Sequence, residues 1–134
     1  MTLLVPNVGE GRMLKAIVNH TAPENLILEL YSSNTTPAET DTYATYTETT
    51  FTGYTEASLT GASWTITEGA PSYAQYAQQT FTSSAGSQNV DVYGYLLKQT
   101  TSTILMWAER FPTAPYNIAN NGDAIKITPY LELA

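Results

Sequence analysis

The chain has 134 residues and no cysteine, so it has the length of one domain and can form neither disulfides nor thiolate metal sites. Its formal net charge of −7 argues against nucleic acid and anionic membrane surfaces as partners, since both attract basic proteins. No apolar run approaches the roughly 20 residues of a membrane-spanning helix. The N-terminal residues also lack the basic and then apolar pattern of a signal peptide.

The first predicted element is a helix near the N-terminus. An apolar stripe with i, i+3, i+4 spacing runs through Met13, Leu14, Ile17 and Val18. Asn7 and Glu10 have the spacing of a capping box at its start. We therefore expect a helix over about residues 10–19, preceded by an extended N-terminal arm over residues 1–7.

The segments after the helix alternate as strands do. Strand-like runs cover residues 25–32, 63–67, 72–83, 89–98 and 102–111. Strict alternation places Tyr73 with Phe81 on one face of its strand, and Val92 with Leu96 on one face of another. The run over 102–111 is apolar on both faces at its centre, which predicts a central strand covered on both sides.

The C-terminal segment, "YNIANNGDAIKITPYLELA", predicts a hairpin. Asn121-Gly122 is a strong signal for a two-residue turn, because both positions need a positive φ. This turn would pair Ile118 with Ile125 across the two strands, with both side chains in the core. Pro129 cannot donate to a ladder and is expected at an edge or a bulge.

Strands at intervals of about ten residues are typical of antiparallel sandwiches and barrels. We expect one mainly β domain over residues 1–134, built as an antiparallel β-sandwich or a flattened barrel with one short N-terminal helix.

Residues for catalysis are sparse. His20 is the one histidine and stands in a polar context, where a surface or capping role is the simpler interpretation. No nucleophile elbow or phosphate-binding motif occurs. Glu39, Asp41 and Asp123 could bind calcium, although turn residues of this kind are commonly just solvated. We expect no enzyme activity, no metal and no cofactor.

Two regions are candidate protein-contact sites. The stretch "YATYTETTFTGYTEASLTG" is rich in Thr and Tyr and has no basic residue, so it predicts a contact surface at Tyr43, Tyr46, Phe51 and Tyr54. The alternative is that β propensity alone explains this composition. Glu109 and Arg110 end an apolar strand, where they form either a docking or interface site or a strand end that emerges into solvent.

Several phrases resemble a family of small β-rich proteins encoded among the structural genes of tailed bacteriophages. They are "LLVPNVGE", "ENLILELYSSNTTPAETDT", "FTGYTEASLTGASWTIT", "YAQQTFTSSAG", "VYGYLLK", "WAERF" and "IANNGDAIKITPYLEL". The resemblance covers nearly the whole chain and defines no site residue. It implies a virion structural protein, made in the host cytoplasm, that binds the major capsid protein or another virion protein. Head decoration (cement) is the leading role, and a homo-oligomer is expected because capsid sites lie near symmetry axes.

Three alternatives remain open at this point. The first is a tail or neck component of the virion. The second is a carbohydrate-binding module, which would present Trp64 or Trp107 as an exposed platform, whereas a structural protein would bury both. The third is an enzyme.

Overall fold

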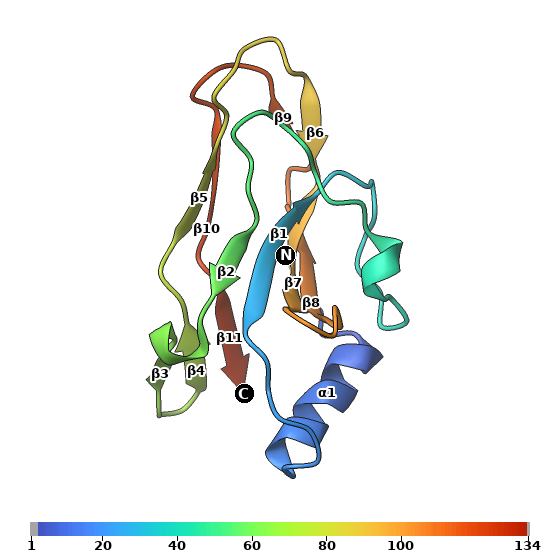
Figure 1. Cartoon of the computed structure of the whole chain (residues 1–134), viewed down its shortest axis with the longest axis vertical. Coiled ribbons are helices and arrows are strands. Elements are labelled where there is room, and N and C mark those ends of the chain that lie inside the picture. Colours follow the sequence, from blue (N-terminus) through green and yellow to red (C-terminus); the bar gives the residue numbers. More distant parts are fainter. Residues whose placement is uncertain (1–2, 134) are drawn as a thin grey trace.

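The computed structural model describes residues 3–133 and shows a mainly β chain with one α-helix near its N-terminus (Figure 1). The elements in chain order are α1 (Asn7–Ile17), β1 (Leu26–Tyr31), the 3-10 turn η1 (Tyr43–Thr45), β2 (Ala57–Leu59), the 3-10 turn η2 (Gly61–Ser63), β3 (Thr65–Thr67), β4 (Ser72–Gln75), β5 (Gln79–Thr82), β6 (Val90–Val92), β7 (Gly94–Gln99), β8 (Leu105–Arg110), β9 (Tyr116–Ile118), β10 (Ala124–Ile127) and β11 (Tyr130–Leu133). No helix in residues 3–133 is long and apolar enough to cross a membrane.

One layer, here called layer 1, is an antiparallel sheet with the strand order β2-β1-β7-β8. The pair β6-β9 continues β7 and β8 after a short break, because Phe111 N donates to Tyr93 O and Val92 then pairs with Tyr116. The predicted strands over 25–32 and 102–111 are therefore confirmed as β1 and β8. However, β8 is the outer strand of its sheet rather than a central one.

The second layer, here called layer 2, is one long interrupted hairpin with β3 added beside it. Strand β5 pairs with β10, and β4 pairs with β11 on one side and β3 on the other. Tyr76 N donates to Pro129 O at 2.9 Å across the interruption. Pro129 thus lies at a break in the ladder, where its missing N–H leaves no unpaired donor.

The two layers enclose the main core and form an antiparallel β-sandwich whose sheets do not close into a barrel within residues 3–133. The core side chains of layer 1 include Leu28, Leu30, Val92, Leu97, Trp107 and Ile118. Those of layer 2 include Phe81, Ile125 and Ile127. Burial of these side chains provides most of the free energy that holds the layers together.

A smaller cluster covers the outer face of layer 1. Tyr31, Leu96, Leu105 and Ala108 point outward from the sheet and are buried beneath Tyr43 and Tyr46. The long segment between β1 and β2 passes over this face (Figure 1). Both faces of β1 and β7 are therefore shielded from water, which explains why nearly all of their residues are buried.

The predicted C-terminal hairpin is wrong in its pairing. A turn forms at Asn121-Gly122, with Asp123 N donating to Asn120 O, but only Gly122 of the two has the expected positive φ, at +92°. The strands that leave it separate into different layers, because β9 pairs with β6 and β10 pairs with β5. Ile118 and Ile125 are both buried in the core, but they reach it from opposite layers.

The helix lies earlier in the chain and faces differently from the prediction. It begins directly after Pro6, with Glu10 N donating to Pro6 O, and no side chain caps it. The expected capping box of Asn7 and Glu10 is therefore absent. Gly9 is buried against β8, and Met13 on the same side of the helix packs against the core.

Residues 3–6 do not form a free arm. Leu4 makes an antiparallel bridge with Ala108, in which each N–H donates to the other's carbonyl at 3.0 Å. Leu3 and Val5 pack against the core and Pro6 is buried. This segment covers the open edge of β8, which removes an unpaired strand edge. The first two residues of the expected arm lie outside the described part of the chain.

Candidate functional site

A buried ion pair lies on the outer face of layer 1. Glu29 of β1 is completely buried, and its Oε1 contacts Nζ of Lys98 in β7. Lys98 lies opposite Ile27 in the ladder, and Ile27 and Glu29 are two residues apart on β1. The side chains of Lys98 and Glu29 therefore lie on the same face of the sheet. The side chain of Lys98 is 11% exposed. Two oppositely charged groups are thus removed from water together, which is far less costly than burying either alone.

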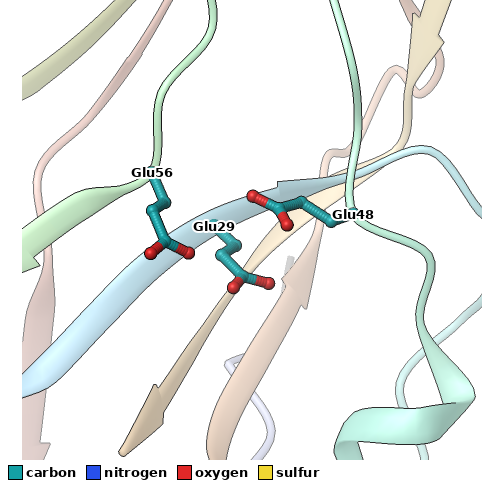
Figure 2. A group of neighbouring side chains, drawn as sticks. All are labelled: Glu29, Glu48 and Glu56. Atoms are coloured by element: carbon teal, nitrogen blue, oxygen red, sulfur yellow. The ribbon is translucent and has the colours of Figure 1, made fainter. Parts of the chain in front are cut away.

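The segment between β1 and β2 adds three polar side chains to this pair. The Tyr43 hydroxyl donates to Glu29 Oε1 at 3.2 Å and accepts from Lys98 Nζ at 3.2 Å. Figure 2 shows Glu48 and Glu56 reaching toward Glu29 from either side of β1. Carboxylate oxygens of the three glutamates lie within 4.8 Å of one another, and Glu56 Oε2 is 3.7 Å from Lys98 Nζ. We call these five residues the Lys98 cluster.

The Lys98 cluster has more negative than positive charge. Burial raises the pKa of Glu29, and the nearby Glu56 and Glu48 raise it further, while the hydrogen bond with Lys98 opposes the shift. Burial by itself lowers the pKa of Lys98, but Glu29 and Tyr43 outweigh it and the net pKa is raised. Glu29 Oε2 is buried without a hydrogen-bond partner.

A group of carboxylates can also hold a hard cation such as calcium. Here the ammonium group of Lys98 lies among the carboxylates and already provides a positive charge at that point. The ring of Tyr43 covers the same ammonium at 4.5 Å from its centroid. The arrangement therefore brings an amine, a buried carboxyl group and a second carboxylate into contact.

The four aromatic side chains of the predicted contact surface are buried or half-buried in this chain. Tyr46 and Phe51 are buried, the first over the outer face of layer 1 and the second in the main core. Tyr43 is half-buried over Lys98, and Tyr54 is half-buried, with its hydroxyl accepting from Leu30 N at 3.1 Å. Burial of these rings explains the Thr- and Tyr-rich composition, since the rings point inward and the threonines other than the buried Thr49 cover the outside.

Glu109 and Arg110, the second predicted contact site, make hydrogen bonds within this chain. Glu109 is half-buried and accepts a hydrogen bond from the Tyr95 hydroxyl. Arg110, also half-buried, donates to Thr35 O at 3.1 Å and to Asn34 Oδ1 at 2.8 Å. Both side chains thus fasten neighbouring segments of this chain to the end of β8.

The remaining sequence candidates are explained by local structure. Asp41 accepts hydrogen bonds from Ala38 N and the Tyr46 hydroxyl, and Asp123 accepts from Ala119 N and Asn120 N. Both carboxylates therefore stabilise turns. His20 is exposed, and its ring lies 3.2 Å from the Thr21 hydroxyl.

Of the four residues in the predicted apolar stripe of the helix, Met13 packs against the core and the other three point outward. Leu14, Ile17 and Val18 are 63, 79 and 70% exposed. Their i, i+3, i+4 spacing groups them on one side of the helix end, next to the side that packs through Gly9 and Met13. The stripe is a contiguous apolar patch that no other described residue covers, and such patches commonly mark interaction sites.

An apolar cleft of about 310 Å³ lies between α1 and layer 2. It is lined by residues that include Met13, Ala16, Trp64, Ala74, Trp107 and Leu131. Trp107 is 3% exposed and Trp64 is half-buried, with their ring centroids 6.3 Å apart. Neither tryptophan forms the exposed platform that a sugar-binding surface of this type requires.

Sequence reasoning missed the Lys98 cluster. Its members are far apart in the chain, and alternation alone could not show that the outer face of β1 is covered. One signal was available, because a glutamate and a lysine inside strongly apolar strands need partners when those strands are buried.

No protein-family model, no curated protein and no solved structure matches this chain.

Proposed function

We propose that this protein is a non-enzymatic structural component of a tailed-bacteriophage particle, and that it decorates and braces the head lattice by docking through α1. The observation that carries the proposal is the exposed stripe of Leu14, Ile17 and Val18. Three large aliphatic side chains on one side of a helix gain free energy when a partner covers them. The resemblance to phage structural proteins gives the class of partner, and a tail or neck position is the alternative within the same particle.

The docking surface differs from the one expected from the sequence. The stripe on α1 stays exposed because the helix packs against the sandwich through Gly9 and Met13, on the neighbouring side. Individual contacts can be modest, since a repeated lattice offers many equivalent sites and linked binding events raise the avidity.

The experiment is co-sedimentation of the purified protein with empty heads, together with light scattering to measure its own oligomeric state. The double variant Leu14→Asp/Val18→Asp should lose binding or oligomerisation, because it places two charges in the contact. A matched control is Ile66→Asp, which makes the same kind of change at a residue that is 63% exposed on β3.

The control should bind heads as the unmodified protein does. Circular dichroism should show that all variants are folded, because the substituted side chains are exposed. If the double variant binds heads and assembles as well as the unmodified protein, α1 is not the docking surface.

One observation favours carbohydrate binding as a second candidate. Tyr73 and Tyr130 stack with ring centroids 5.1 Å apart, and Tyr130 is 38% exposed. Paired rings of this kind can support a sugar. Retention on a polysaccharide column that is lost in Tyr130→Ala, with no binding to heads, would favour this function over the structural one.

A further inference from the structure

Lys98 is the only lysine in residues 3–133 that has a carboxylate oxygen within 4.0 Å. Its partner, Glu29, comes from the adjacent strand and is completely buried. Nζ of Lys98 is in direct contact with Oε1 of Glu29, the oxygen bonded to the carboxyl carbon that would be attacked. The amine and the carboxyl group are therefore held in contact, which removes the entropic cost of bringing two reacting groups together.

A third group is in place to move protons. Glu56 Oε2 lies 3.7 Å from Lys98 Nζ, and a Glu56 carboxylate oxygen lies within 4.8 Å of one of Glu29. Glu56 is partly exposed, with 40% of its side chain accessible, so it can exchange protons with solvent. The Tyr43 hydroxyl contacts both reacting side chains and holds them together.

We propose that Lys98 and Glu29 become joined by an intramolecular isopeptide bond, with Glu56 as the group that transfers protons. This modification is independent of the proposed docking function. It would link β1 to β7 covalently in a chain that has no cysteine and cannot form a disulfide.

The step begins with transfer of a proton from the Lys98 ammonium group to the Glu29 carboxylate. The neutral amine nitrogen then attacks the carboxyl carbon, a C–N bond forms, and one C–O bond of the carboxyl group breaks. Glu56 accepts a proton from the nitrogen and delivers it to the departing hydroxyl group, which leaves as water. The products are one amide and one water molecule, so neither an oxidant nor an activating nucleotide is needed.

The surroundings favour this chemistry in three ways. Removal from water makes the neutral acid and amine less unfavourable relative to the ion pair. Reacting groups held in contact behave as if they were at very high concentration. A positioned carboxylate contributes about 10²–10⁴-fold to rates by proton transfer. Burial also raises the pKa of Glu29, which increases the share of the neutral acid, whereas Glu29 and Tyr43 raise the pKa of Lys98 and oppose the loss of its proton.

The test is the intact mass of the purified, denatured protein. We expect the mass to be lower than that of the sequence by one water molecule. The Lys98→Met variant, which keeps a side chain of similar length without an amine, should have the full mass of its sequence. Most Glu56→Gln molecules should have the full mass of their sequence, or should lose water at least tenfold more slowly than the unmodified protein, because the group that transfers protons is absent.

Lys126→Met is the matched control, because Lys126 is an exposed lysine outside the Lys98 cluster with no carboxylate oxygen of residues 3–133 within 4.0 Å of its Nζ. This control should lose water as the unmodified protein does. A full sequence mass for the unmodified protein, or a deficit that persists in Lys98→Met, overturns the proposal. The first measurement uses no variant, so it does not depend on whether the variants fold.

Discussion

At the residue scale, Trp107 occupies the centre of the interior. It is 3% exposed, lies opposite Leu97 in the ladder and contacts Trp64 edge-on. We expect Trp107→Ala to lower the free energy of unfolding by about 3–5 kcal/mol, as other large core truncations do. Chemical denaturation measures this loss. Trp107→Phe should cost less because the cavity is smaller and the unpaired indole N–H is removed. A loss below about 1 kcal/mol for the alanine variant would show that this position is not central.

Glu24 provides a prediction about pH. Hydrogen bonds from Ser102 N and Thr101 N, with Arg12 at 2.8 Å, lower the pKa of this carboxyl group, and burial opposes them. Because the pKa of Glu24 is lower in the folded state, its charge stabilises the fold at pH values above the ordinary pKa of 4.5. This stabilisation is lost as the pH falls through the pKa of the folded state. We expect Glu24→Gln to cost about 1–3 kcal/mol at neutral pH.

The difference between Glu24→Gln and the unmodified protein should shrink below about pH 4.5, where the unfolded chain binds a proton at this residue. Urea denaturation at a series of pH values measures this difference. A difference that stays constant down to pH 2 would mean that the charge of Glu24 contributes nothing.

At the scale of elements, two glycines of α1 provide a paired test of how closely the helix packs against β8. A Cβ at Gly9 would collide with the carbonyl oxygen of Met106 and lie 3.0 Å from that of Leu105, whereas a Cβ at Gly11 has nothing within 4 Å. Gly9→Ala should therefore destabilise the protein by pushing α1 off β8. Gly11→Ala should stabilise it by about 0.5–1 kcal/mol, because alanine is the better helix former. Thermal unfolding of both variants checks the pair, and equal effects would contradict the close contact between α1 and β8.

The sequence predicted that the helix exists but not which side is buried. The stripe through Leu14, Ile17 and Val18 has the spacing of a core-facing surface, yet the helix packs through Gly9 and Met13. Close approach of the helix backbone to β8 needs a residue without a side chain, and apolar periodicity gives glycine no weight. From a single sequence, an apolar stripe that contacts a partner cannot be distinguished from one that packs into the core.

Strand positions were predicted better than strand faces. The prediction that Val92 and Leu96 share a face is wrong, because Val92, Tyr95 and Leu97 face the core while Leu96 faces outward. The alternation shifts at Gly94, which packs directly against the Tyr31 ring and the Glu109 carbonyl. The break between β4 and β5 likewise places the side chains of Tyr73 and Phe81 on different faces. Such breaks depend on tertiary contacts and leave no periodic signal.

At the scale of the whole molecule, the chain passes from layer 2 to layer 1 and back again. The β5–β6 and β9–β10 connections cross between the layers side by side, joined where Gln88 N donates to Ala119 O (Figure 1). The missed C-terminal pairing belongs here, because Asn121-Gly122 predicts a turn equally well whether the strands beside it pair or separate. Local turn chemistry cannot distinguish a hairpin from a crossing between layers.

Because these two connections join the layers, we expect that the layers cannot unfold separately. We expect tryptophan fluorescence and far-ultraviolet circular dichroism to report one coincident transition in urea. Refolding should take milliseconds to seconds, as is usual for sandwiches dominated by contacts distant in sequence. Two separate transitions would contradict the coupling of layer 1 to layer 2 through these connections.

The covering of Lys98 has a practical consequence for chemical conjugation. Among the lysine side chains, Lys15 and Lys126 are exposed while Lys98 is shielded beneath Tyr43. Lys15 lies on α1 next to Leu14, so a dye or cargo attached there would obstruct the proposed docking surface. Lys126 lies on the outer face of β10, in the other layer from the strand that α1 contacts. With Lys15→Arg, Lys126 is the exposed lysine that remains in residues 3–133, and cargo attached to its side chain would lie away from the proposed docking surface.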